Sequence, residues 1–578
     1  MLCFRFAPWS RHRWRCGWLL LGLALTWSTN FEAPPAFLAA ESRALPRVPG
    51  TALRGARGAA GGGGTLDAGS PASRQLLAGL VLLGTGSCAR FAWKRTACLR
   101  RGKAKDAVVE ALGEDFFNQL RARVASSSSG SSSLRPLIVA MGTRGDAEPG
   151  FRLAAALKER GHEPLVVSLD AYKEEAVKRW NLDFRSCGLE RVPLSEEYLT
   201  GQTRADQVYS DRGWYGDAWT MVGERLHQAA LEHRCDLIVT TSMGNTHCLD
   251  VAEQLNLLCI ALKFCPDIDG QVPTGDFPPS GYPSLPGPLN YLQHLLENSR
   301  TVAAVFRGGY IPKVIDFRTK LGMESMEIPG VGAKVPTYSE LRQKQQANQP
   351  SLYAFSDALA NRPQEYQSWH FVTGSFSANE SRDVELPGVL RDFLASSPVC
   401  IAFGSISLAR GDDDSSGGSG GAPFQRRALA AARRQELPVL VVDPEVEVEG
   451  PDADDPGVFR LRSAPYSALF PRCRLVVHHG GAGTAQDAVR AECPQLVAPV
   501  LAWSDQPFWA REVEERKLGV KVGEGGRAPS DEDWEQTLQR CLASLEEFQR
   551  NARQAKERMM QEGGVQMACQ IIEDVMLS

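Results

Sequence analysis

Short apolar runs that alternate with helix-length amphipathic stretches constrain the fold of this chain more than any other feature of its sequence. The runs are nearly continuous in Val, Ile and Leu, as expected for strands that are buried on both faces of a parallel sheet. Repeated units of this kind predict doubly wound α/β sheets, with ligands at the carboxyl ends of the strands. The predicted strands are 136–141, 164–169, 236–240, 258–263, 399–403, 438–442, 475–478 and 495–499.

The predicted strands fall into two groups, which a Pro- and Gly-rich segment (266–288) and a mostly helical segment (291–347) separate. We therefore expect two Rossmann-like domains that face each other across a cleft. A Ser-rich stretch before the first strand has the composition of a flexible linker. The predicted organisation is a leader at 1–105, a helix and linker at 106–133, a first domain at 134–382 and a second at 383–578.

The composition excludes several classes of protein. The chain has 578 residues, 64 of them Lys or Arg and 68 Asp or Glu, so its overall charge does not indicate a nucleic-acid partner. A hydrophobic content of 43% excludes a wholly disordered chain. No two of the 14 cysteines stand in C-x-x-C spacing, so we expect buried thiols rather than a zinc ribbon or a dithiol redox site.

The leader differs from the rest of the chain in charge. Residues 1–105 hold 16 Lys and Arg against 3 Asp and Glu. A basic start and an apolar stretch (17–27) have the outline of a secretory signal, and the stretch is too short for a relaxed bilayer span. With the FEAPP element at 31–35 and a second apolar stretch (76–89), the leader resembles the bipartite plastid presequences of some algae. It predicts membrane association, with entry to the secretory pathway or a plastid as the alternatives.

The most informative motif is HHGGAGT at 478–484, which follows a predicted strand and opens a predicted helix. Glycines allow a tight turn and a close approach of the main chain to a ligand. The exposed amides at a helix N-terminus bind anions, and here they suit a diphosphate. No Lys follows the last glycine, and the GxGxxG fingerprint is absent, so the motif is neither a P-loop nor a dinucleotide-binding turn.

A second motif, GTRGD at 142–146, follows the first predicted strand. Its one acid, Asp146, has two possible roles. A carboxylate in this loop can accept a proton from an attacking hydroxyl. It can equally cap the helix that follows. The residues alone do not decide between these roles.

Together the two motifs resemble those of the two-domain GT-B glycosyltransferases, above all the sterol 3-beta-glucosyltransferases, whose N-terminal domain is of the glycosyltransferase family 28 type, and related antibiotic glycosyltransferases. The resemblance covers about 134–564 and includes further matches in the expected order. These are LYAFS at 352–356, VTG at 372–374, FGS at 403–405, LFPRC at 469–473 and DQPFW at 505–509.

The resemblance implies a role for each matching residue. Asp146 would be the general base. Ser405, His479, Gly481, Gly483 and Thr484 would hold the donor diphosphate. Asp505 and Gln506 would bind hydroxyls of the sugar. Pro465 would approach the nucleotide base, and Asp487 falls where related plant enzymes bind the ribose.

The implied reaction is the inverting transfer of a hexose, glucose by the likeness, from a UDP-sugar to a sterol or similar lipid hydroxyl. It requires no metal or other cofactor and no nucleic acid, and the leader would contact a membrane surface. The segment 266–291 would set the acceptor. Donor identity is less constrained, because Pro499 precedes Asp505 by six residues where the family usually has four.

Three alternatives stay open at this point. The acceptor can be another lipid, such as diacylglycerol. A nucleotide-sugar epimerase can share the architecture, although GTRGD with HHGGAGT argues against it. A non-catalytic nucleotide-sugar binding protein would not need Asp146, His479 and the Asp505–Gln506 pair.

Overall fold

The structure is a computed structural model of the chain. It describes residues 103–127, 133–191, 218–267, 277–278, 285, 287–297, 311–323, 345–376, 386–404, 421–444, 446–502, 504–523, 525 and 528–577. All of them lie in one compact unit, Arg95–Ser578. The predictions for the leader at 1–102, for Ser405 and for most of the acceptor segment fall outside the described residues.

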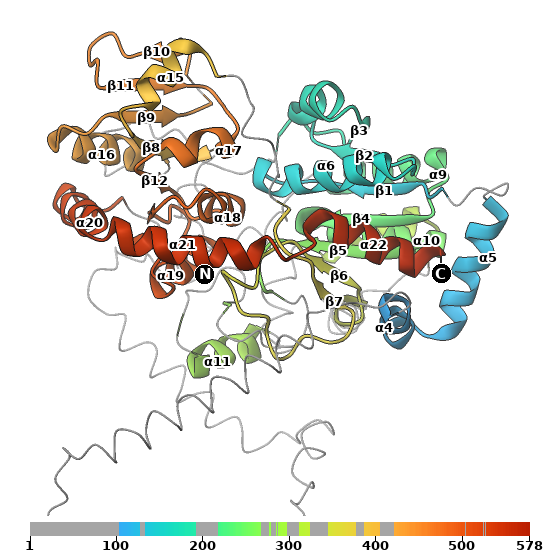
Figure 1. The fold of residues 1–578 in the computed structure, drawn as a ribbon. Helices are drawn as coiled ribbons and strands as arrows, with labels where there is room; N and C mark the ends of the chain where they lie inside the picture. The colour runs from blue at the N-terminus through green and yellow to red at the C-terminus, as the bar shows by residue number, and fades with distance from the viewer. Residues whose placement is uncertain are drawn as a thin grey trace, which may run out of the picture. The chain divides into compact units, whose positions relative to one another are not determined.

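The first group of strands forms a seven-stranded sheet in which every neighbouring pair is parallel (Figure 1). The strand order is β3-β2-β1-β4-β5-β6-β7. The direction of winding reverses between β1 and β4, and ligands of doubly wound sheets bind at such a point. The strands are β1 Pro136–Val139, β2 Leu165–Ser168, β3 Asp183–Ser186, β4 Leu237–Thr241, β5 Leu258–Lys263, β6 Ser351–Tyr353 and β7 His370–Val372.

The second group forms another seven-stranded sheet, in the order β10-β11-β9-β8-β12-β13-β14. All its pairs are parallel except β10 with β11. Its winding reverses between β8 and β12, directly before the HHGGAGT motif. The strands are β8 Val399–Ala402, β9 Val439–Val442, β10 Gly450–Pro451, β11 Val458–Leu461, β12 Leu475–His478, β13 Gln495–Val497 and β14 Gly519–Lys521.

The predicted fold class, two doubly wound α/β domains, is confirmed, and each of the eight predicted strands is present. The sequence missed six strands, of which β10 has two residues and β6, β7 and β14 have three. So short a run carries too little periodicity to be read as a strand.

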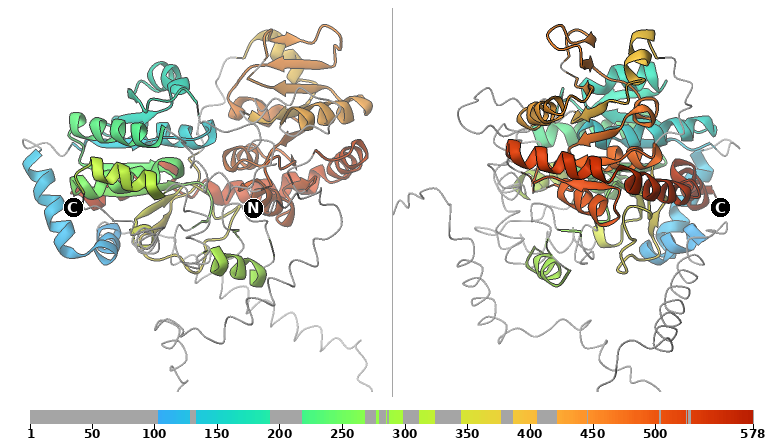
Figure 2. Two further views of the ribbon diagram at one scale, coloured as in Figure 1. Left: turned by 180° about the vertical axis from the view of Figure 1, so that it is seen from behind. Right: turned by 60° about the vertical axis from the view of Figure 1, so that its left-hand side comes forward.

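Helices cover both faces of each sheet (Figures 1 and 2). On β1, Leu137 packs in the cluster that contains α9 and α10, and Ile138 packs in the cluster that contains α6 and α22. The longer helices of the first sheet are α6 Arg144–Glu159, α9 Trp219–His233, α10 Asn245–Leu255, α11 Gly287–Glu297 and α13 Ile311–Lys320. Those that follow in the chain are α15 Gly388–Leu394, α16 Gly421–Arg434, α17 Tyr466–Leu469, α18 Ala482–Arg490, α19 Gln506–Glu515, α20 Asp531–Ala543, α21 Leu545–Met559 and α22 Gly564–Leu577.

The helical segment before the Ser-rich linker is two helices, α4 Lys103–Leu112 and α5 Glu114–Ser127, with Gly113 at a φ of 90° between them. Val108, Phe117 and Leu120 are buried in the same apolar cluster as the first sheet. The predicted boundaries at 105 and 133 stay a prediction. The packing shows that residues on both sides of the first of them belong to this core.

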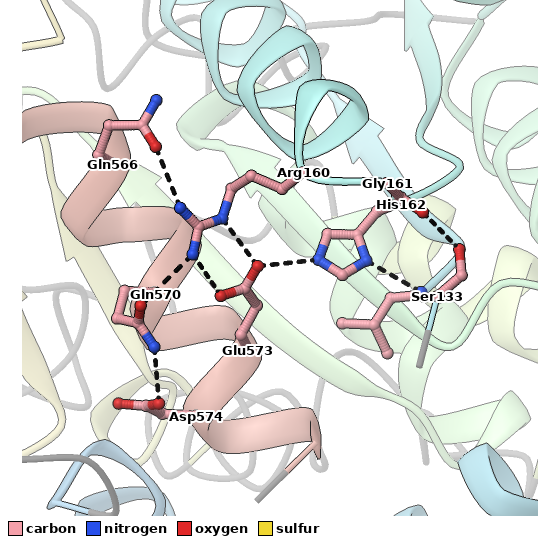
Figure 3. A network of polar contacts seen from close by, with 9 residues as sticks. Ser133, Arg160, Gly161, His162, Gln566, Gln570, Glu573 and Asp574 are labelled. Carbon is pink, nitrogen blue, oxygen red and sulfur yellow. Dashed lines mark hydrogen bonds and ion pairs between the residues drawn. The ribbon is translucent and has the colours of Figure 1, made fainter. Parts of the chain in front are cut away.

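The C-terminal helix α22 also packs on the first sheet, beside α4 and α6. Polar side chains fasten it there (Figure 3). The Arg160 guanidinium donates to both carboxylate oxygens of Glu573, at 2.7 and 2.5 Å. Nε2 of His162 lies 3.1 Å from Glu573, while its Nδ1 accepts from the Leu134 amide. The chain therefore returns to the first sheet after it has completed the second.

A shared core joins the two sheets. One buried cluster contains Tyr353 at the end of β6 and Phe355 after it, together with Val497 of β13 and Trp509 of α19. The side chain of Gln486 in α18 accepts from the Ser356 amide at 2.8 Å. These contacts bring the segment that follows β6 against α18 and α19, which follow strands of the second sheet.

Candidate active site

The last three residues of the GTRGD motif, 144–146, form the first turn of α6, where a loop was expected. Thr143 is the N-cap, and both its amide and its hydroxyl donate to Oδ2 of Asp146, at 2.8 and 2.9 Å. Both bonds use the same carboxylate oxygen. Asp146 therefore caps the helix with Oδ2, and Oδ1 is left to accept a proton. The two roles that the sequence left open are compatible in one side chain.

The surroundings of Asp146 favour a proton acceptor. Burial raises the pKa of Asp146, and the hydrogen bonds from Thr143 oppose that rise. The carboxyl lies over Gly142, where a Cβ would come within 2.4 Å of Oδ2. Gly142 has a φ of 134°, which favours glycine as well. The motif thus needs its first glycine to make room for the carboxylate.

The two histidines of HHGGAGT have different environments. His478 is fully buried; its Nδ1 accepts from the Gly480 amide at 3.1 Å and its Nε2 donates to Gln495 at 2.9 Å. Burial, with the charge of His479 second, lowers the pKa of His478 to about 3. His478 therefore shapes the loop as a neutral side chain.

His479 is the histidine that is available to a ligand. Its ring is half-buried, and its Nδ1 is a buried atom without a hydrogen-bond partner in the described part of the chain. Burial lowers the pKa of His479 to about 4. At neutral pH it can donate a hydrogen bond, but it brings no positive charge.

The glycines of this motif bring the main chain close to its neighbours and leave space for a ligand. Gly480 has a φ of 91°, and a Cβ there would lie 2.9 Å from the main-chain oxygen of Gln506. A Cβ on Gly483 would meet nothing within 4 Å. Gly481 is the N-cap of α18, and Thr484 is in its first turn, where the amides have no partner within the helix. This turn has the geometry that binds anions at helix N-termini, and its role at a diphosphate stays a prediction.

Asp505 and Gln506 begin α19. Asp505 Oδ2 accepts from the indole of Trp509 at 3.1 Å. Burial first, and the charge of Asp146 second, raise the pKa of Asp505 to about 7. Gln506 is buried, and its Oε1 accepts from the amides of Val500 and Leu501, both at 2.9 Å. Gln506 thus fixes the turn before it through Oε1, and the sugar-binding role of Asp505 and Gln506 stays a prediction.

Pro465 and Asp487 lie on neighbouring helices of the donor half. Pro465 is the N-cap of α17, whose first residue, Tyr466, stacks on Phe470 with ring centroids 4.4 Å apart. Asp487, on α18, interacts electrostatically with Tyr466. The predicted base-binding and ribose-binding residues are therefore close together.

Sequence reasoning missed an ion pair at the carboxyl end of β5. Lys263 Nζ lies 2.8 Å from Asp267 Oδ2, and its side chain is only 3% exposed. Asp267 contributes to the electrostatic environment of Asp505. A lysine at the end of the apolar run LCIALK, with an acid four residues later, was the available signal.

The described residues hold no group of three or more His, Cys, Asp or Glu side chains arranged to bind a metal ion. In the same residues, we find no helix with the length and apolar character to span a bilayer.

Comparisons with known proteins give the class to which the chain belongs. Residues 439–571 match the family described as erythromycin biosynthesis protein CIII-like, C-terminal domain. The chain is 28% identical over 465 residues to the O-mycaminosyltylonolide 6-deoxyallosyltransferase of Streptomyces fradiae, covering 76% of this chain and 97% of the relative. It is 23% identical to a sterol 3-beta-glucosyltransferase of Arabidopsis thaliana, covering 66% of this chain and 57% of that one.

The sterol 3-beta-glucosyltransferase of Pichia angusta is 24% identical, and the match spans 77% of this chain but 34% of the relative. The chain thus spans about half or less of the length of these two sterol enzymes. Among solved structures, the glycotransferase of kitacinnamycin covers 76% of this chain with a TM-score of 0.53 at 15% identity. The spinosyn forosaminyltransferase covers 77% with a TM-score of 0.51 at 18% identity.

The fold is therefore that of the GT-B glycosyltransferases, and the chain is a glycosyltransferase. Within that class its sequence resembles both macrolide glycosyltransferases and sterol 3-beta-glucosyltransferases.

Proposed function

We propose that this protein transfers a hexose, glucose by the likeness, from a UDP-sugar to the hydroxyl of a sterol or similar lipid, with inversion and without a metal. The observation that carries the proposal is the geometry of Asp146. Its Oδ2 is fixed by Thr143, its Oδ1 remains to accept a proton, and it interacts electrostatically with Asp505 of the donor half.

In the proposed mechanism, Asp146 takes the proton of the acceptor hydroxyl as the oxygen attacks the anomeric carbon. The bond from that carbon to the diphosphate breaks, and its electrons go to the leaving oxygen. The amides of the α18 N-terminus, with His479 and Thr484 as neutral donors, stabilise the charge where it develops. Asp505 would hold the sugar, and Pro465 and Asp487 the nucleoside. Ser405 keeps its proposed role at the diphosphate.

The direct test is release of UDP from UDP-glucose with and without a sterol, followed by the anomeric configuration of the product. Sterol-dependent release with inversion supports the proposal. Release that does not depend on any lipid alcohol, or a product with retained configuration, contradicts it. A panel of other lipids, diacylglycerol included, tests the acceptor class.

We further propose that residues 1–102 bring the enzyme to a membrane, since anionic surfaces attract basic segments by about 1 kcal/mol per Lys or Arg near the surface. Removal of 1–102 should keep the enzyme folded and active and abolish vesicle binding. Removal of 1–133 should also lower the melting temperature, because it takes away Val108, Phe117 and Leu120. Equal stability of the two truncations would show that α4 and α5 do not belong to the core.

A further inference from the structure

The diphosphate that leaves in the proposed reaction carries more negative charge than the donor motif neutralises. The segment 478–484 holds no Lys or Arg, and the low pKa values of its two histidines, about 3 for His478 and about 4 for His479, make both rings neutral at pH 7. The helix N-terminus supplies only a partial charge. A side chain with a full positive charge beside this motif would add to that stabilisation.

Arg144 lies at the edge of the first sheet where such a charge is needed. It is the first residue of α6, two positions before Asp146. Its guanidinium lies 3.0 Å from Glu175 and 3.5 Å from Glu148. The side chain is nevertheless 42% exposed. It is held in place by two carboxylates and still has donors for a ligand.

Arg144 is linked electrostatically to the half of the molecule that contains the second sheet. It interacts with Tyr466 of α17, and Tyr466 interacts in turn with Asp487 of α18. Tyr466 directly follows Pro465. The guanidinium thus lies near the residues proposed to hold the nucleoside, in the half of the molecule that carries the base.

The two carboxylates do not use up the positive charge around Arg144. Glu148 is shared with Arg152, at 2.6 Å, and Glu175 is shared with Arg179, at 3.0 Å. Three guanidinium groups and two carboxylates make a cluster with one net positive charge. A dianionic ligand can approach this cluster without meeting an excess of negative charge.

Resting on the proposed function, we propose that Arg144 binds the donor diphosphate and stabilises it as it leaves. Arginine suits this role because its planar fork of donors matches phosphate oxygens in pairs. The acceptor proton goes to Asp146, the new bond forms at the anomeric carbon, and the electrons of the broken bond reside on a phosphate oxygen that Arg144 contacts. One turn of α6 then carries both the base and the counter-charge to the leaving group.

The test compares UDP with uridine, which lacks the diphosphate, by calorimetric titration of the full chain. Arg144→Gln should lose at least about tenfold of UDP affinity with uridine affinity unchanged, and kcat should fall about 10²–10³-fold, as for a lost oxyanion donor. Arg179→Gln is the matched control, because Arg179 makes the same 3.0 Å contact with Glu175 and is 37% exposed. The control should keep the wild-type ratio of UDP to uridine affinity.

An unchanged ratio in Arg144→Gln overturns the proposal. So does an equal loss in Arg179→Gln, since that result assigns the effect to the ion-pair cluster as a whole. Thermal unfolding shows that each variant is folded. If Arg144→Gln is not, Arg144→Lys replaces it; this variant keeps the charge and loses the paired donors, so it should show a smaller loss of UDP affinity with uridine affinity unchanged, and no loss overturns the proposal. If the wild type binds neither UDP nor uridine, the proposed function itself fails. That result differs from the two outcomes that overturn only the role of Arg144.

Discussion

The turns after β1 and β12 occupy equivalent places in their sheets, and they are built from opposite materials. The turn after β1 is charged: Arg144, Asp146 and Glu148 stand in the first turn and a half of α6. An ion pair joins Arg144 to Glu148, and hydrogen bonds from Thr143 hold Asp146. The turn after β12 has no charged side chain from 478 to 484 and consists of neutral histidines, glycines and a threonine.

The proposed mechanism assigns different tasks to the two turns. The turn after β1 would supply the side chains that take up or balance charge during the reaction. The turn after β12 would supply space, main-chain amides and neutral hydrogen bonds that are in place before the donor binds. Preorganised dipoles of this kind stabilise a developing charge without having to reorient.

The largest effect is expected from a substitution in the charged turn after β1. Asp146→Asn should lower kcat about 10²–10⁴-fold, the usual effect of removing a general base. Asparagine still accepts the hydrogen bonds from Thr143, so the melting temperature and the UDP affinity should change little. A variant that turns over at the wild-type rate would show that Asp146 is only a helix cap.

A smaller effect is expected from a substitution in the uncharged turn after β12, where the glycines leave open space. Gly483→Ala should weaken UDP binding about tenfold or more without loss of stability, because a Cβ there meets open space in the protein and alanine favours a helix. Gly480→Ala is the contrasting variant; its positive φ and the nearby Gln506 oxygen predict lower stability as well. If Gly483→Ala bound UDP with the wild-type affinity, the ligand would not lie at this turn.

The smallest effect concerns Asp505, the acid that the donor half holds near Asp146. Its pKa of about 7 exceeds the value of about 3.9 in an unfolded chain, so the protein should lose stability as pH rises from 4 to 7. Asp505→Asn should remove that loss. The stability of the variant relative to the wild type should therefore be higher at pH 8 than at pH 5. Urea unfolding at both pH values measures the difference.

Asp452→Asn is the control with the opposite sign. The hydrogen bond from Arg460 lowers the pKa of Asp452, so this carboxylate adds stability at neutral pH that is lost in acid. An Asp505→Asn variant that loses stability at pH 8, as the control should, would contradict the burial of an ionisable acid at the site.

The strands that bear the two motifs could be predicted from the sequence, because β1 and β12 are four residues long and mostly apolar, as are the neighbouring strands β8 and β9. The turns could be located because they follow these strands. The sequence could not show that the two possible roles of Asp146 are compatible, since that depends on which oxygen Thr143 contacts. Nor could it pair Lys263 with Asp267, because that contact depends on how the chain turns after β5.

The path of the C-terminus was beyond prediction for a similar reason. Helix α22 is amphipathic and would suit either sheet. Its place on the first sheet depends on partners far away in the sequence, such as Arg160 and His162 with Glu573. A helix that follows the second sheet in the sequence, as α22 does, can therefore pack on the first sheet, and its position in the sequence does not reveal this.

The central claim is that one carboxylate of the acceptor half performs the proton transfer, and the pH dependence of kcat tests it most directly. The wild-type rate should fall as pH is lowered, about tenfold per pH unit below the pKa of Asp146, which burial raises above the ordinary value of an aspartate. The residual rate of Asp146→Asn should lack this acid limb. If the variant keeps the same limb, another group, with Asp505 the nearest candidate, controls the reaction and the account is wrong.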